Sequence, residues 1–584
     1  MKQNMSLQNN IKITMLSSKE ALASFARKFR ASSYLNWVTP APAPERLLLA
    51  PHNLRNADPI TARDIYSGRF FFSGQLVELN GHSPFNEKNA SIAWKEKLLA
   101  FEWIRHLAVE NNSLAVSNAQ TLIRDWISVH GRPKKHISWN LEIAARRLLS
   151  WIHHSIPIVE NCDPAFYRAW MRSIGIHIKF LKYGCRHAPL GLPRLLCRIA
   201  LSYAAICISD QSSYLRNASA LLDEELSLQI LPDGGHISRN PGVIPDLLSF
   251  LLPLREAYAK LGKAPSQELV SSIDRLMVAL KFYRLGDGEI AHFNGSSTTI
   301  VDLVSAILRY DDAKGGAPDN ATSSNYQRIV KEKTTLIVDT GISPNGPLSK
   351  SVHAGTLSFE FSANQTPIIV NCGALNSTNT ELNLAARHTA AHNTLTLNDT
   401  SSSQIHKNQK SRIFGQKISG PTQVISSREN NANSSLIQMH HNGYAKIFNT
   451  LHHRMLGVDN TGNKIIGEDR LTDTNDKLLD ENNEQEFAIR FHLNPSLSAG
   501  KTEDGTSILI MGGNGIAWKF TCIDIIPQLE ESLFFAANSG LRKTKQIVLY
   551  GNTKQVSEVR WIFEKQLQEK TPRKKRIKAK QLPL

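Results

Sequence analysis

The sequence changes character at Gly315-Gly316-Ala317-Pro318-Asp319-Asn320. Glycine, proline and the Asp-Asn pair are turn and loop residues, so this stretch is a candidate linker. Before it, apolar residues recur at spacings of three and four, and after it they alternate with polar residues. These two periods are typical of helices and strands. The stretch therefore divides an all-α half of the chain from an all-β half.

The helical half extends from about residue 88 to residue 310. One-sided apolar stripes follow one another along it, for example Trp94, Leu98, Phe101, Ile104 and Leu107, and later Leu269, Ile273, Leu276, Leu280 and Tyr283. Roughly eight to ten such helices are expected, joined by short polar connections. Consecutive antiparallel helix hairpins form either a solenoid or a closed toroid. A repeat of fixed length is not evident, which disfavours a solenoid array.

The second half has the alternating pattern of strands. Three apolar residues, Leu357, Phe359 and Phe361, alternate with Ser358, Glu360 and Ser362. Further short apolar runs lie at 368–370, 508–510, 518–520, 547–550 and 559–563. Many short strands separated by turns predict an antiparallel β-sandwich. The polar interval 400–435 is expected to be a long loop or a hairpin.

The predicted fold class is therefore a multidomain α+β protein, with an N-terminal α/α toroid followed by a C-terminal antiparallel β-sandwich. Its predicted divisions are an N-terminal extension (1–85), the toroid domain (86–315), the sandwich domain (330–565) and a basic, disordered tail (566–584). A chain of 584 residues is too long for one core, which agrees with more than one domain.

The overall amino-acid composition limits which classes of protein this chain can belong to. Hydrophobic residues make up 41% and charged residues 20%, as in folded soluble proteins. No apolar run approaches the roughly 18 residues of a membrane-spanning helix, and Met1–Arg30 lacks the apolar core of a signal peptide. The six cysteines include no Cys-x-x-Cys pair, so neither a disulfide framework nor a thiolate zinc site is expected. The net charge of +17 suits a polyanionic partner, either nucleic acid or an acidic polysaccharide.

The first candidate for chemistry is the segment Leu231–Gly242, which lies between two predicted helices. Its glycines and prolines make it irregular, and it places His236, Arg239 and Asn240 close together. The segment is either a tight connection between helices, since Asp-Gly and Asn-Pro are ordinary turn pairs, or a binding site.

The second candidate is Arg387-His388-Thr389-Ala390-Ala391-His392-Asn393-Thr394-Leu395-Thr396-Leu397-Asn398-Asp399. It places imidazole and guanidinium groups before a short strand whose Leu395 and Leu397 would face the core, with Thr394, Thr396 and Asn398 on the other face. Nine of the chain's 20 histidines follow residue 350, and as a set they could hold a divalent metal. The spacing typical of a chelating motif is absent.

Several motifs, taken in order, resemble those of the heparinase II/III-like proteins. They are Pro232-Asp233-Gly234-Gly235-His236 with Arg239-Asn240-Pro241, then 353–360, 387–394, His441-Asn442-Gly443-Tyr444 and His453-Arg454. The resemblance covers roughly residues 70 to 565. It implies a polysaccharide lyase with a toroid and a sandwich, acting on uronate-containing glycans. It also implies a place in the cell envelope or periplasm, whereas the missing signal peptide taken by itself indicates the cytoplasm.

The reaction implied by this resemblance is β-elimination. A base removes the proton next to the uronate carboxylate after donors or cations have offset its charge. On this pattern Asn240 is expected to neutralise the carboxylate, assisted by Arg239 or His236. The family commonly has His or Tyr beside that Asn, but here Pro241 follows it. The base is therefore unassigned, and the candidates are Tyr283, His292 and Tyr444.

The resemblance also implies roles for residues of the β half. Arg387, His388 and Tyr444 are expected to contact the substrate. His392 and His441, with Asp399 as the nearest acidic residue, are expected to hold one structural divalent metal, Zn or Ca.

Three functional hypotheses follow. The leading one is a lyase that cleaves acidic polysaccharides, and the alternative is a non-catalytic glycan-binding or cell-envelope protein on the same scaffold. A nucleic-acid-binding protein is disfavoured because no groove-reading motif accompanies the positive charge. The sequence predicts neither the glycan nor the oligomeric state.

Overall fold

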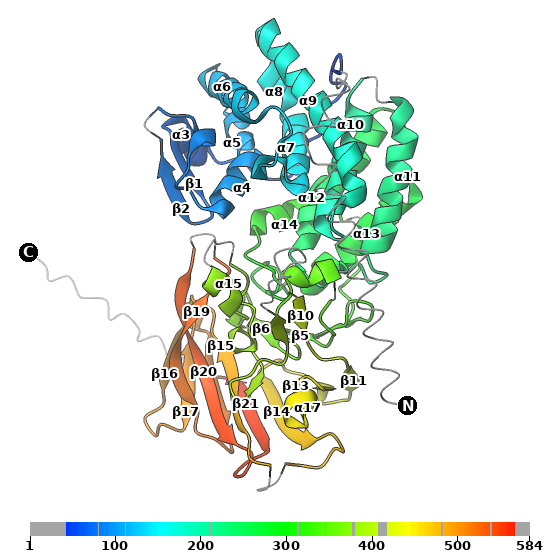
Figure 1. The fold of residues 1–584 in the computed structure, drawn as a ribbon. Coiled ribbons are helices and arrows are strands. Elements are labelled where there is room, and N and C mark those ends of the chain that lie inside the picture. The colour runs from blue at the N-terminus through cyan, green and yellow to red at the C-terminus, as the bar shows by residue number, and fades with distance from the viewer. Residues whose placement is uncertain are drawn as a thin grey trace, which may run out of the picture.

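The structure, a computed structural model, is drawn in Figure 1. It describes residues 43–79, 81–110, 113–209, 212–311, 315–344, 346–375, 380–406, 417–479, 483–537 and 540–566. The predicted basic tail, apart from residue 566, and the first 42 residues lie outside the described residues.

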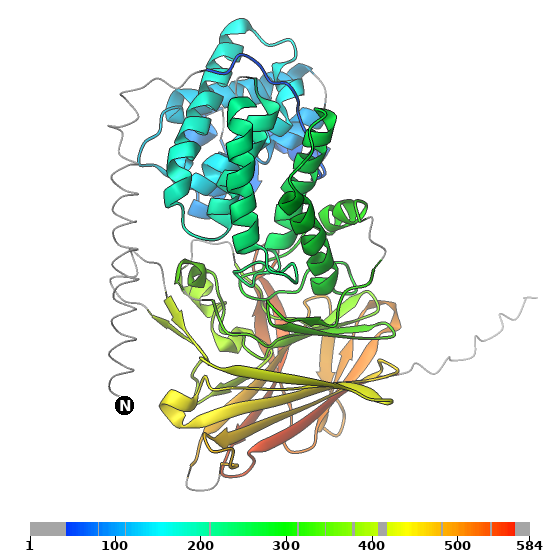
Figure 2. The same cartoon turned by 90° about the vertical axis from the view of Figure 1, so that its right-hand side faces the viewer.

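The first half is a toroid of antiparallel helices above the strands of the second half (Figures 1 and 2). Its helices are α4 (Ile92–Ala100), α5 (Ile104–Val109), α6 (Ser113–His130), α7 (Leu141–His153), α8 (Ser155–Val159), α9 (Pro164–Gly184), α10 (Leu192–Cys207), α11 (Ser212–Gln229), α12 (Val243–Lys260), α13 (Gln267–Tyr283) and α14 (Val301–Leu308). Helix α10 is buried along nearly its whole length because α7, α9, α11 and α12 pack around it. The predicted α/α toroid is confirmed.

The described part of the predicted N-terminal extension packs on the toroid. It forms α3 (Pro59–Tyr66) and a hairpin of β1 (Arg69–Phe72) and β2 (Gln75–Glu78). Ile65 and Phe70 belong to the same hydrophobic core as the toroid's Trp94. Phe70 and Trp94 also meet edge to face, with ring centroids 6.3 Å apart. These residues are therefore an integral part of the helical domain.

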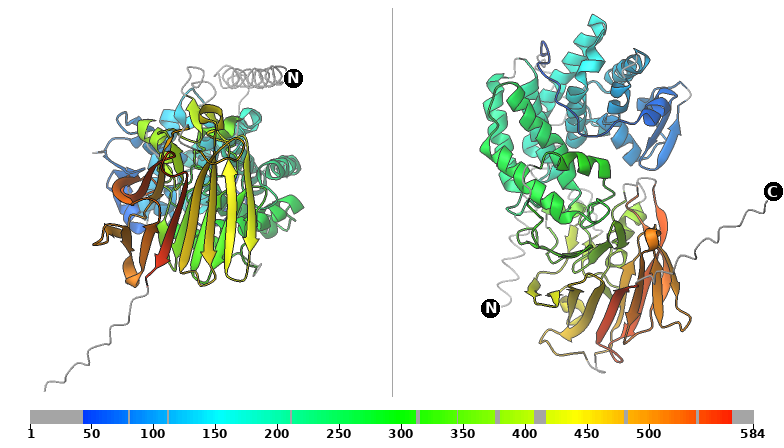
Figure 3. Two further views of the ribbon diagram at one scale, coloured as in Figure 1. Left: turned by 90° about the horizontal axis from the view of Figure 1, so that it is seen from below. Right: turned by 180° about the vertical axis from the view of Figure 1, so that it is seen from behind.

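The second half is an antiparallel β-sandwich. One layer has the strand order β11 (Val424–Asn430), β12 (Ser434–His441), β13 (Thr450–Asp459), β14 (Lys464–Asp473), β21 (Glu558–Lys565), β18 (Ala517–Cys522), β17 (Ser507–Met511) and β16 (Ser498–Lys501). Figure 3 shows these strands lying side by side in the view from below.

The opposing layer combines two smaller sheets. They are β3 (Asn320–Ala321), β4 (Tyr326–Lys331), β5 (Thr334–Asp339), β6 (Phe359–Ala363) and β7 (Thr366–Ile369), and then β19 (Gln528–Phe534), β20 (Arg542–Asn552), β15 (Glu486–His492) and β8 (Leu395–Leu397). A bridge between Ile369 and Leu493 links the two sheets.

Aromatic side chains fill the space between the layers. Phe359 of β6 stacks on Trp561 of β21, with ring centroids 5.6 Å apart and ring planes 9° from parallel. Gly467 of β14 lies under this indole, and a Cβ at that position would come within 2.1 Å of the Trp561 ring. The core therefore requires glycine there.

The alternation of apolar and polar residues predicts the strands correctly, but it does not predict that their polar faces are buried as well. Every residue of β6 is buried, including Glu360 and Ser362 on the face opposite the core. Thr394 and Thr396 beside β8 are buried as well. The polar face of β6 is covered because loops of the toroid rest on it.

Smaller elements complete the second half. The interval predicted as a loop or hairpin contains β9 (Gln404–His406) paired with β10 (Lys417–Ser419), followed by β11. Two short helices, α15 (Thr380–Ala385) and α17 (Ala445–Phe448), lie between strands. All six cysteines are free. Within the described ranges, no helix combines the length and apolarity needed to cross a bilayer.

Candidate functional site

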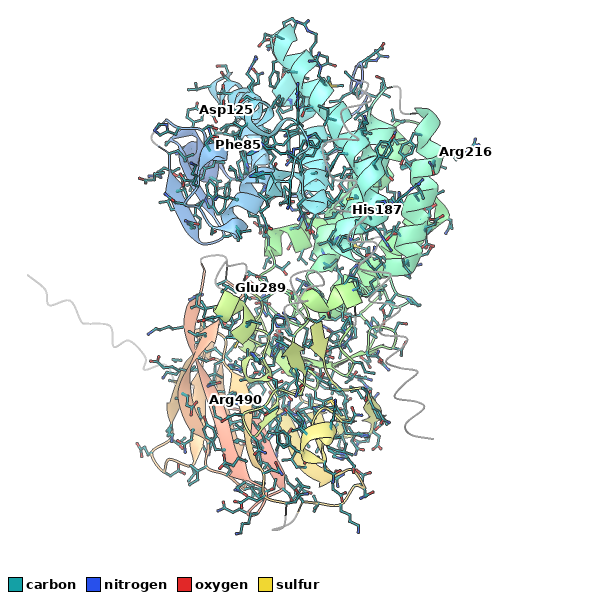
Figure 4. All side chains as sticks on the ribbon, in the orientation of Figure 1. Phe85, Asp125, His187, Arg216, Glu289 and Arg490 are labelled. Atoms are coloured by element: carbon teal, nitrogen blue, oxygen red, sulfur yellow. The ribbon has the colours of Figure 1, made fainter. Side chains whose placement is uncertain are left out.

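The predicted catalytic segment lies at the junction between the toroid and the sandwich. Two toroid loops meet the sandwich there, namely 230–242 after α11 and 284–300 between α13 and α14. Figure 4 places Glu289 of the second loop at this boundary, between the helices above and the strands below.

The first loop is held by Asp233. Its Oδ2 accepts hydrogen bonds from the backbone N–H groups of Ser323 (2.8 Å) and Ser324 (2.7 Å) in the sandwich. The Ser324 hydroxyl donates to the same oxygen at 3.0 Å. The Asp-Gly pair that suggested a turn therefore also docks the loop on the sandwich.

Arg239 forms the second part of this joint. Its Nη2 lies 2.5 Å from Oδ1 of Asp339 at the end of β5, and both side chains are buried. Its Nε donates to the Ser324 carbonyl at 2.8 Å and Nη2 donates to the Asn325 carbonyl at 3.0 Å. The guanidinium also lies 4.6 Å from the ring centroid of Tyr326. We call Asp233, Arg239 and Asp339 the interdomain clamp.

Arg239 therefore does not have the accessible guanidinium expected of a group that assists at a substrate carboxylate. Its backbone φ of 56° is in the left-handed region, which a non-glycine residue enters only at a cost of about 1–2 kcal/mol. Contacts on several sides hold that conformation. The clamp thus corrects the expected role of Arg239 from substrate binding to interdomain docking.

His236 is fixed inside the same loop. The backbone N–H of Ser238 donates to Nδ1 at 3.2 Å, so the ring proton lies on Nε2, which donates to Oε1 of Gln229 at 3.0 Å. Burial lowers the pKa of His236 to about 4. The ring is neutral near pH 7 and cannot offset a carboxylate's charge as a cation, contrary to its expected assisting role.

Tyr283 is also internal. Its hydroxyl lies 3.1 Å from the Ser324 hydroxyl, and its ring packs edge to face on Tyr326 with centroids 5.1 Å apart. Burial raises the pKa of Tyr283. A buried phenol with a raised pKa is a poor general base, so its packing role outweighs its predicted role as the base.

His292 sits among carboxylates at the junction. Its side chain is 3% exposed, with Nδ1 3.5 Å from Oε1 of Glu360 and Nε2 3.8 Å from Oε2 of Glu289. Within the described residues, neither ring nitrogen has a hydrogen-bond partner. Burial lowers the pKa of His292, but Glu360, Glu289 and Asp287 outweigh burial, so the pKa is raised. Of the three predicted base candidates, His292 alone pairs with acidic groups.

Asn240 remains partly exposed. Its Oδ1 accepts a hydrogen bond from the Gly242 N–H at 2.9 Å, which fixes the orientation of the carboxamide at the start of α12. Its NH₂ group has no hydrogen-bond partner in the described part of the chain. A Cβ on Gly242 would lie 3.2 Å from Asn240 Oδ1 and 2.9 Å from the Ser296 hydroxyl, so Asn240 lies beside the second junction loop.

The predicted substrate contacts of the β half divide into one exposed and two buried side chains. Arg387 is buried, with Nε donating to the Val352 carbonyl at 2.9 Å and Nη2 to the Ser349 carbonyl at 2.9 Å. Tyr444 is buried in the sandwich core, and its hydroxyl donates to the Leu395 carbonyl at 2.7 Å. His388 is exposed. The buried Arg387 and Tyr444 stabilise the sandwich and do not present their polar groups to a ligand.

The histidines expected to bind metal are separate pairs. His392 donates from Nδ1 to the His388 carbonyl at 2.9 Å, and its Nε2 lies 3.2 Å from Nδ1 of His353. Burial lowers the pKa of His392 to about 4 and holds that of His353 well below its usual value. His392 therefore lies in a buried pair with His353.

His441 belongs to the other pair. Its Nε2 lies 3.4 Å from Nδ1 of His452, whose Nε2 lies 2.7 Å from Oδ1 of Asp469. Asp399 is exposed in the turn after β8. The structure therefore does not bring His392, His441 and Asp399 together, and no cluster of three or more His, Cys, Asp or Glu side chains suited to a metal occurs among the described residues.

Sequence analysis missed the acidic half of the junction. Glu360 was predicted on the polar face of its strand, but it is fully buried and accepts hydrogen bonds from the backbone N–H groups of His292 (3.1 Å) and Asn371 (2.8 Å). Asn294 donates to Asp339 Oδ2 at 2.9 Å and completes the clamp. A charged residue between Phe359 and Phe361 is the only sequence signal for this arrangement, because alternation does not reveal what covers the second face.

Comparison with known proteins agrees with this architecture. The family model described as Heparinase II/III-like, C-terminal, matches residues 313–562. A crystal structure of heparinase III matches with a TM-score of 0.67 and 15% identity, covering 93% of this chain and 89% of that one. The heparan sulfate lyase HepC from Pedobacter heparinus matches with a TM-score of 0.55 and 15% identity, covering 94% and 88%.

A curated relative is similar over nearly the whole chain. FtsZ-localized protein C from Caulobacter vibrioides (strain NA1000 / CB15N) is 28% identical over 538 residues, which are 90% of this chain and 91% of the relative.

The clamp gives a prediction for stability. Arg239→Ala leaves Asp339 buried without its partner, and breaking a buried ion pair in this way costs about 3–5 kcal/mol. We expect that loss in the apparent free energy of unfolding, measured by urea denaturation with tryptophan fluorescence. Arg560→Ala, which removes an exposed ion pair, is the control and should leave the midpoint unchanged. A midpoint for Arg239→Ala equal to that of the control would contradict the clamp.

His292 gives a prediction for pH dependence. Because its pKa is raised in the folded chain, its protonated form stabilises the fold. That contribution is complete below about pH 6.5, the pKa of an unfolded histidine, and is lost as pH rises through the higher folded value. We expect the melting temperature to fall as pH rises above about 6.5, and His292→Gln to flatten that decline.

The matched control is His236→Gln. The pKa of His236 is lowered to about 4, so its titration changes stability only below about pH 6.5 and should not alter the slope above it. Equal slopes for the wild type and His292→Gln would exclude the carboxylate pairing as the cause.

Proposed function

We propose that this chain, whose residues 313–562 match the heparinase II/III-like C-terminal family, binds an acidic polysaccharide at the toroid–sandwich junction without cleaving it. Its fold is that of polysaccharide lyases. Fold alone does not determine activity, so the proposal depends on the groups present at the site.

One observation carries the proposal. The groups that β-elimination would need as cation and base are engaged inside the protein, since Arg239 is paired with Asp339 and Tyr283 is hydrogen-bonded to Ser324. His236 is neutral and bonded through both ring nitrogens. An elimination step needs a base within hydrogen-bond reach of the proton it removes. These three buried side chains do not provide one.

Binding a glycan requires a hydrogen-bond donor at the site but does not require a base. The free NH₂ group of Asn240 is a hydrogen-bond donor whose orientation is fixed by Gly242. A donor held in place by its own loop can bind a uronate carboxylate without reorganisation. The net charge of +17 draws a polyanion toward the protein. Asn240 can therefore recognise a uronate carboxylate even if the glycan is not cleaved.

A lyase remains the second candidate because of His292. Its ring nitrogens lack hydrogen-bond partners among the described residues, so the neutral ring could accept a proton from a substrate that reaches it. The side chain is 3% exposed, however, so a substrate would have to displace part of the junction loop to reach it. In this alternative Asn240 offsets the carboxylate and His292 removes the proton.

The relative from Caulobacter vibrioides suggests where the protein acts. That protein is named for its localization with FtsZ, and the similarity covers nearly the full length of both chains. We include in the proposal that this chain also localizes with FtsZ.

The glycan proposal is tested with heparan sulfate, chondroitin and alginate. We expect the wild type to bind at least one of them, and Asn240→Ala to weaken that binding about tenfold or more, since a hydrogen bond to a charged group contributes about 1.5–3 kcal/mol. The ultraviolet absorbance of an unsaturated uronate should stay at background. Asn475→Ala, in an exposed turn after β14, is the matched control.

Two outcomes would overturn this proposal. Sustained growth of the ultraviolet absorbance that disappears in His292→Gln would establish the lyase. Binding that is equal in the wild type and Asn240→Ala would remove Asn240 from recognition. A loss of binding with EDTA would support the divalent metal predicted from the sequence.

The location is tested by fluorescence microscopy of a tagged full-length chain in dividing cells that also carry labelled FtsZ. We expect a band that coincides with the FtsZ signal. A uniform distribution in cells with an assembled FtsZ ring would exclude this part of the proposal.

A further inference from the structure

Three carboxylates gather at the junction around one imidazole. Asp287 and Glu289 come from the loop between α13 and α14, and Glu360 comes from β6 of the sandwich. Nε2 of His292 lies 3.8 Å from a carboxylate oxygen of Glu289, and Nδ1 lies 3.5 Å from one of Glu360. Among the described residues, none of the three carboxylates forms an ion pair with Lys or Arg. A protonated His292 offsets at most one of the three charges, so negative charge is in excess here.

Buried groups in this cluster lack hydrogen-bond partners. Glu360 is fully buried, and its Oε1 accepts from the backbone N–H groups of His292 and Asn371. Its other oxygen, Oε2, and both ring nitrogens of His292 have no partner within the described part of the chain. The His292 side chain is only 3% exposed. Buried polar groups are normally paired, so this cluster has an unused capacity for hydrogen bonds as well as excess charge.

The cluster reaches the surface through Asp287 and Glu289. The Glu289 side chain is 28% exposed, and Asp287 is half-buried. Oδ1 of Asp287 accepts a hydrogen bond from the Glu289 backbone N–H at 3.0 Å, which keeps the two residues together in the loop. Figure 4 shows Glu289 at the boundary between the helices and the strands. A ligand at the junction therefore meets these two carboxylates first, whereas His292 and Glu360 lie deeper.

Asn240 is presented by a neighbouring segment. A Cβ on Gly242 would lie 3.2 Å from Oδ1 of Asn240 and 2.9 Å from the hydroxyl of Ser296. Ser296 belongs to the same loop as Asp287 and Glu289. The partly exposed donor of one junction loop and the partly exposed carboxylates of the other are thus parts of one boundary region.

The titration of the carboxyl groups agrees with an excess of negative charge. Burial is the main cause that raises the pKa of both Asp287 and Glu289, and the charge of Glu360 raises it further. His292 acts in the opposite direction but does not outweigh these causes. A carboxyl group with a raised pKa keeps its charge less readily, and a cation bound beside it would favour the charged form.

We propose that the glycan bound at the junction carries a free ammonium group, as in an unacetylated amino sugar, and that Glu289 and Asp287 bind this group. The inference rests on the proposed function, because it adds a chemical feature to the glycan that Asn240 recognises. An ammonium group has three N–H donors and a positive charge. Hydrogen bonds between ionised partners are roughly twice as strong as neutral ones. The ligand is then zwitterionic, with its uronate at Asn240 and its amine at the two carboxylates.

The same carboxylates disfavour the related forms of the sugar. An N-acetylated sugar offers one uncharged N–H and leaves Asp287 and Glu289 without a cation. An N-sulfated sugar brings a further negative charge to the cluster, and like charges repel. A metal ion is a weaker match, because the described residues include no group of three or more His, Cys, Asp or Glu side chains suited to one.

The experiment is isothermal titration calorimetry of the full chain with three forms of one uronate–glucosamine polysaccharide, whose amino groups are acetylated, free or sulfated. We expect the free-amine form to bind about tenfold or more tightly than the acetylated form, as for the gain of a charge-assisted contact. The sulfated form should bind most weakly. Calcium chloride alone should give no heat of binding.

The test variant is Glu289→Gln/Asp287→Asn, which removes both charges and keeps the acceptor for the Glu289 N–H. It should bind the free-amine and acetylated forms equally. Glu503→Gln, in the exposed turn between β16 and β17, is the matched control and should keep the preference of the wild type. Asn240→Ala should weaken the acetylated and free-amine forms by the same factor. An unchanged midpoint of urea denaturation shows that the double variant is folded.

The outcomes separate this inference from the proposed function. Equal binding of the acetylated and free-amine forms by the wild type, a preference that the double variant retains, or calcium binding that it loses would overturn the ammonium site. In each case a weakening by Asn240→Ala would leave the proposed function standing.

If none of the three polymers binds, the proposed function fails, and a chitosan oligosaccharide, which has free amines and no uronate, tests the ammonium site by itself. Chitosan binding that is lost in the double variant would support the site without the glycan role of Asn240. Absence of chitosan binding would overturn both.

Discussion

A buried ion pair between Arg239 of the helical domain and Asp339 of β5 holds the two halves of this protein in one arrangement. Two charges taken out of water are favourable only when their remaining hydrogen bonds are satisfied. Here the Ser324 carbonyl accepts from Arg239, and Asn294 donates to Asp339. The pair is therefore the centre of a network that includes both junction loops and the first hairpin of the sandwich. Any ligand that binds at the junction meets a surface whose shape this network fixes.

The clamp also constrains the chemistry. The Arg239 guanidinium is paired with the Asp339 carboxylate in a low-dielectric interior. It cannot bind a substrate carboxylate without leaving Asp339 buried and unpaired. The left-handed backbone of Arg239 is retained because contacts on several sides define it, as is usual for strained residues with a specific role. In this chain that role is docking. The same logic applies to His236, whose ring completes a chain of hydrogen bonds with Gln229.

The order of domains and most strands could be predicted from the sequence, since both follow from local periodicity. The stripe containing Trp94 and the alternation around Phe359 determine which face of each element is apolar. Periodicity places Glu360 on the face opposite Phe359 but does not reveal what covers that face, and in the structure Glu360 is fully buried. Motif resemblance likewise singled out Asn240 and Arg239, but it did not reveal the partner of Arg239, because Asp339 lies 100 residues further along the chain.

The distribution of charge explains how an acidic glycan could approach a junction that itself contains carboxylates. Asp339 is paired with Arg239, whereas Glu360 and Glu289 share the single imidazole of His292, so cations at the junction offset its carboxylates only in part. Exposed cations lie elsewhere on the described surface, and the loop 132–136 carries three of them. Exposed cations act over roughly a Debye length of about 8–10 Å and set the rate of encounter, whereas a fixed donor such as Asn240 acts only on contact. In the proposed glycan-binding role, the exposed cations would attract the polymer and Asn240 would recognise it, so the two tasks would fall on different parts of the surface.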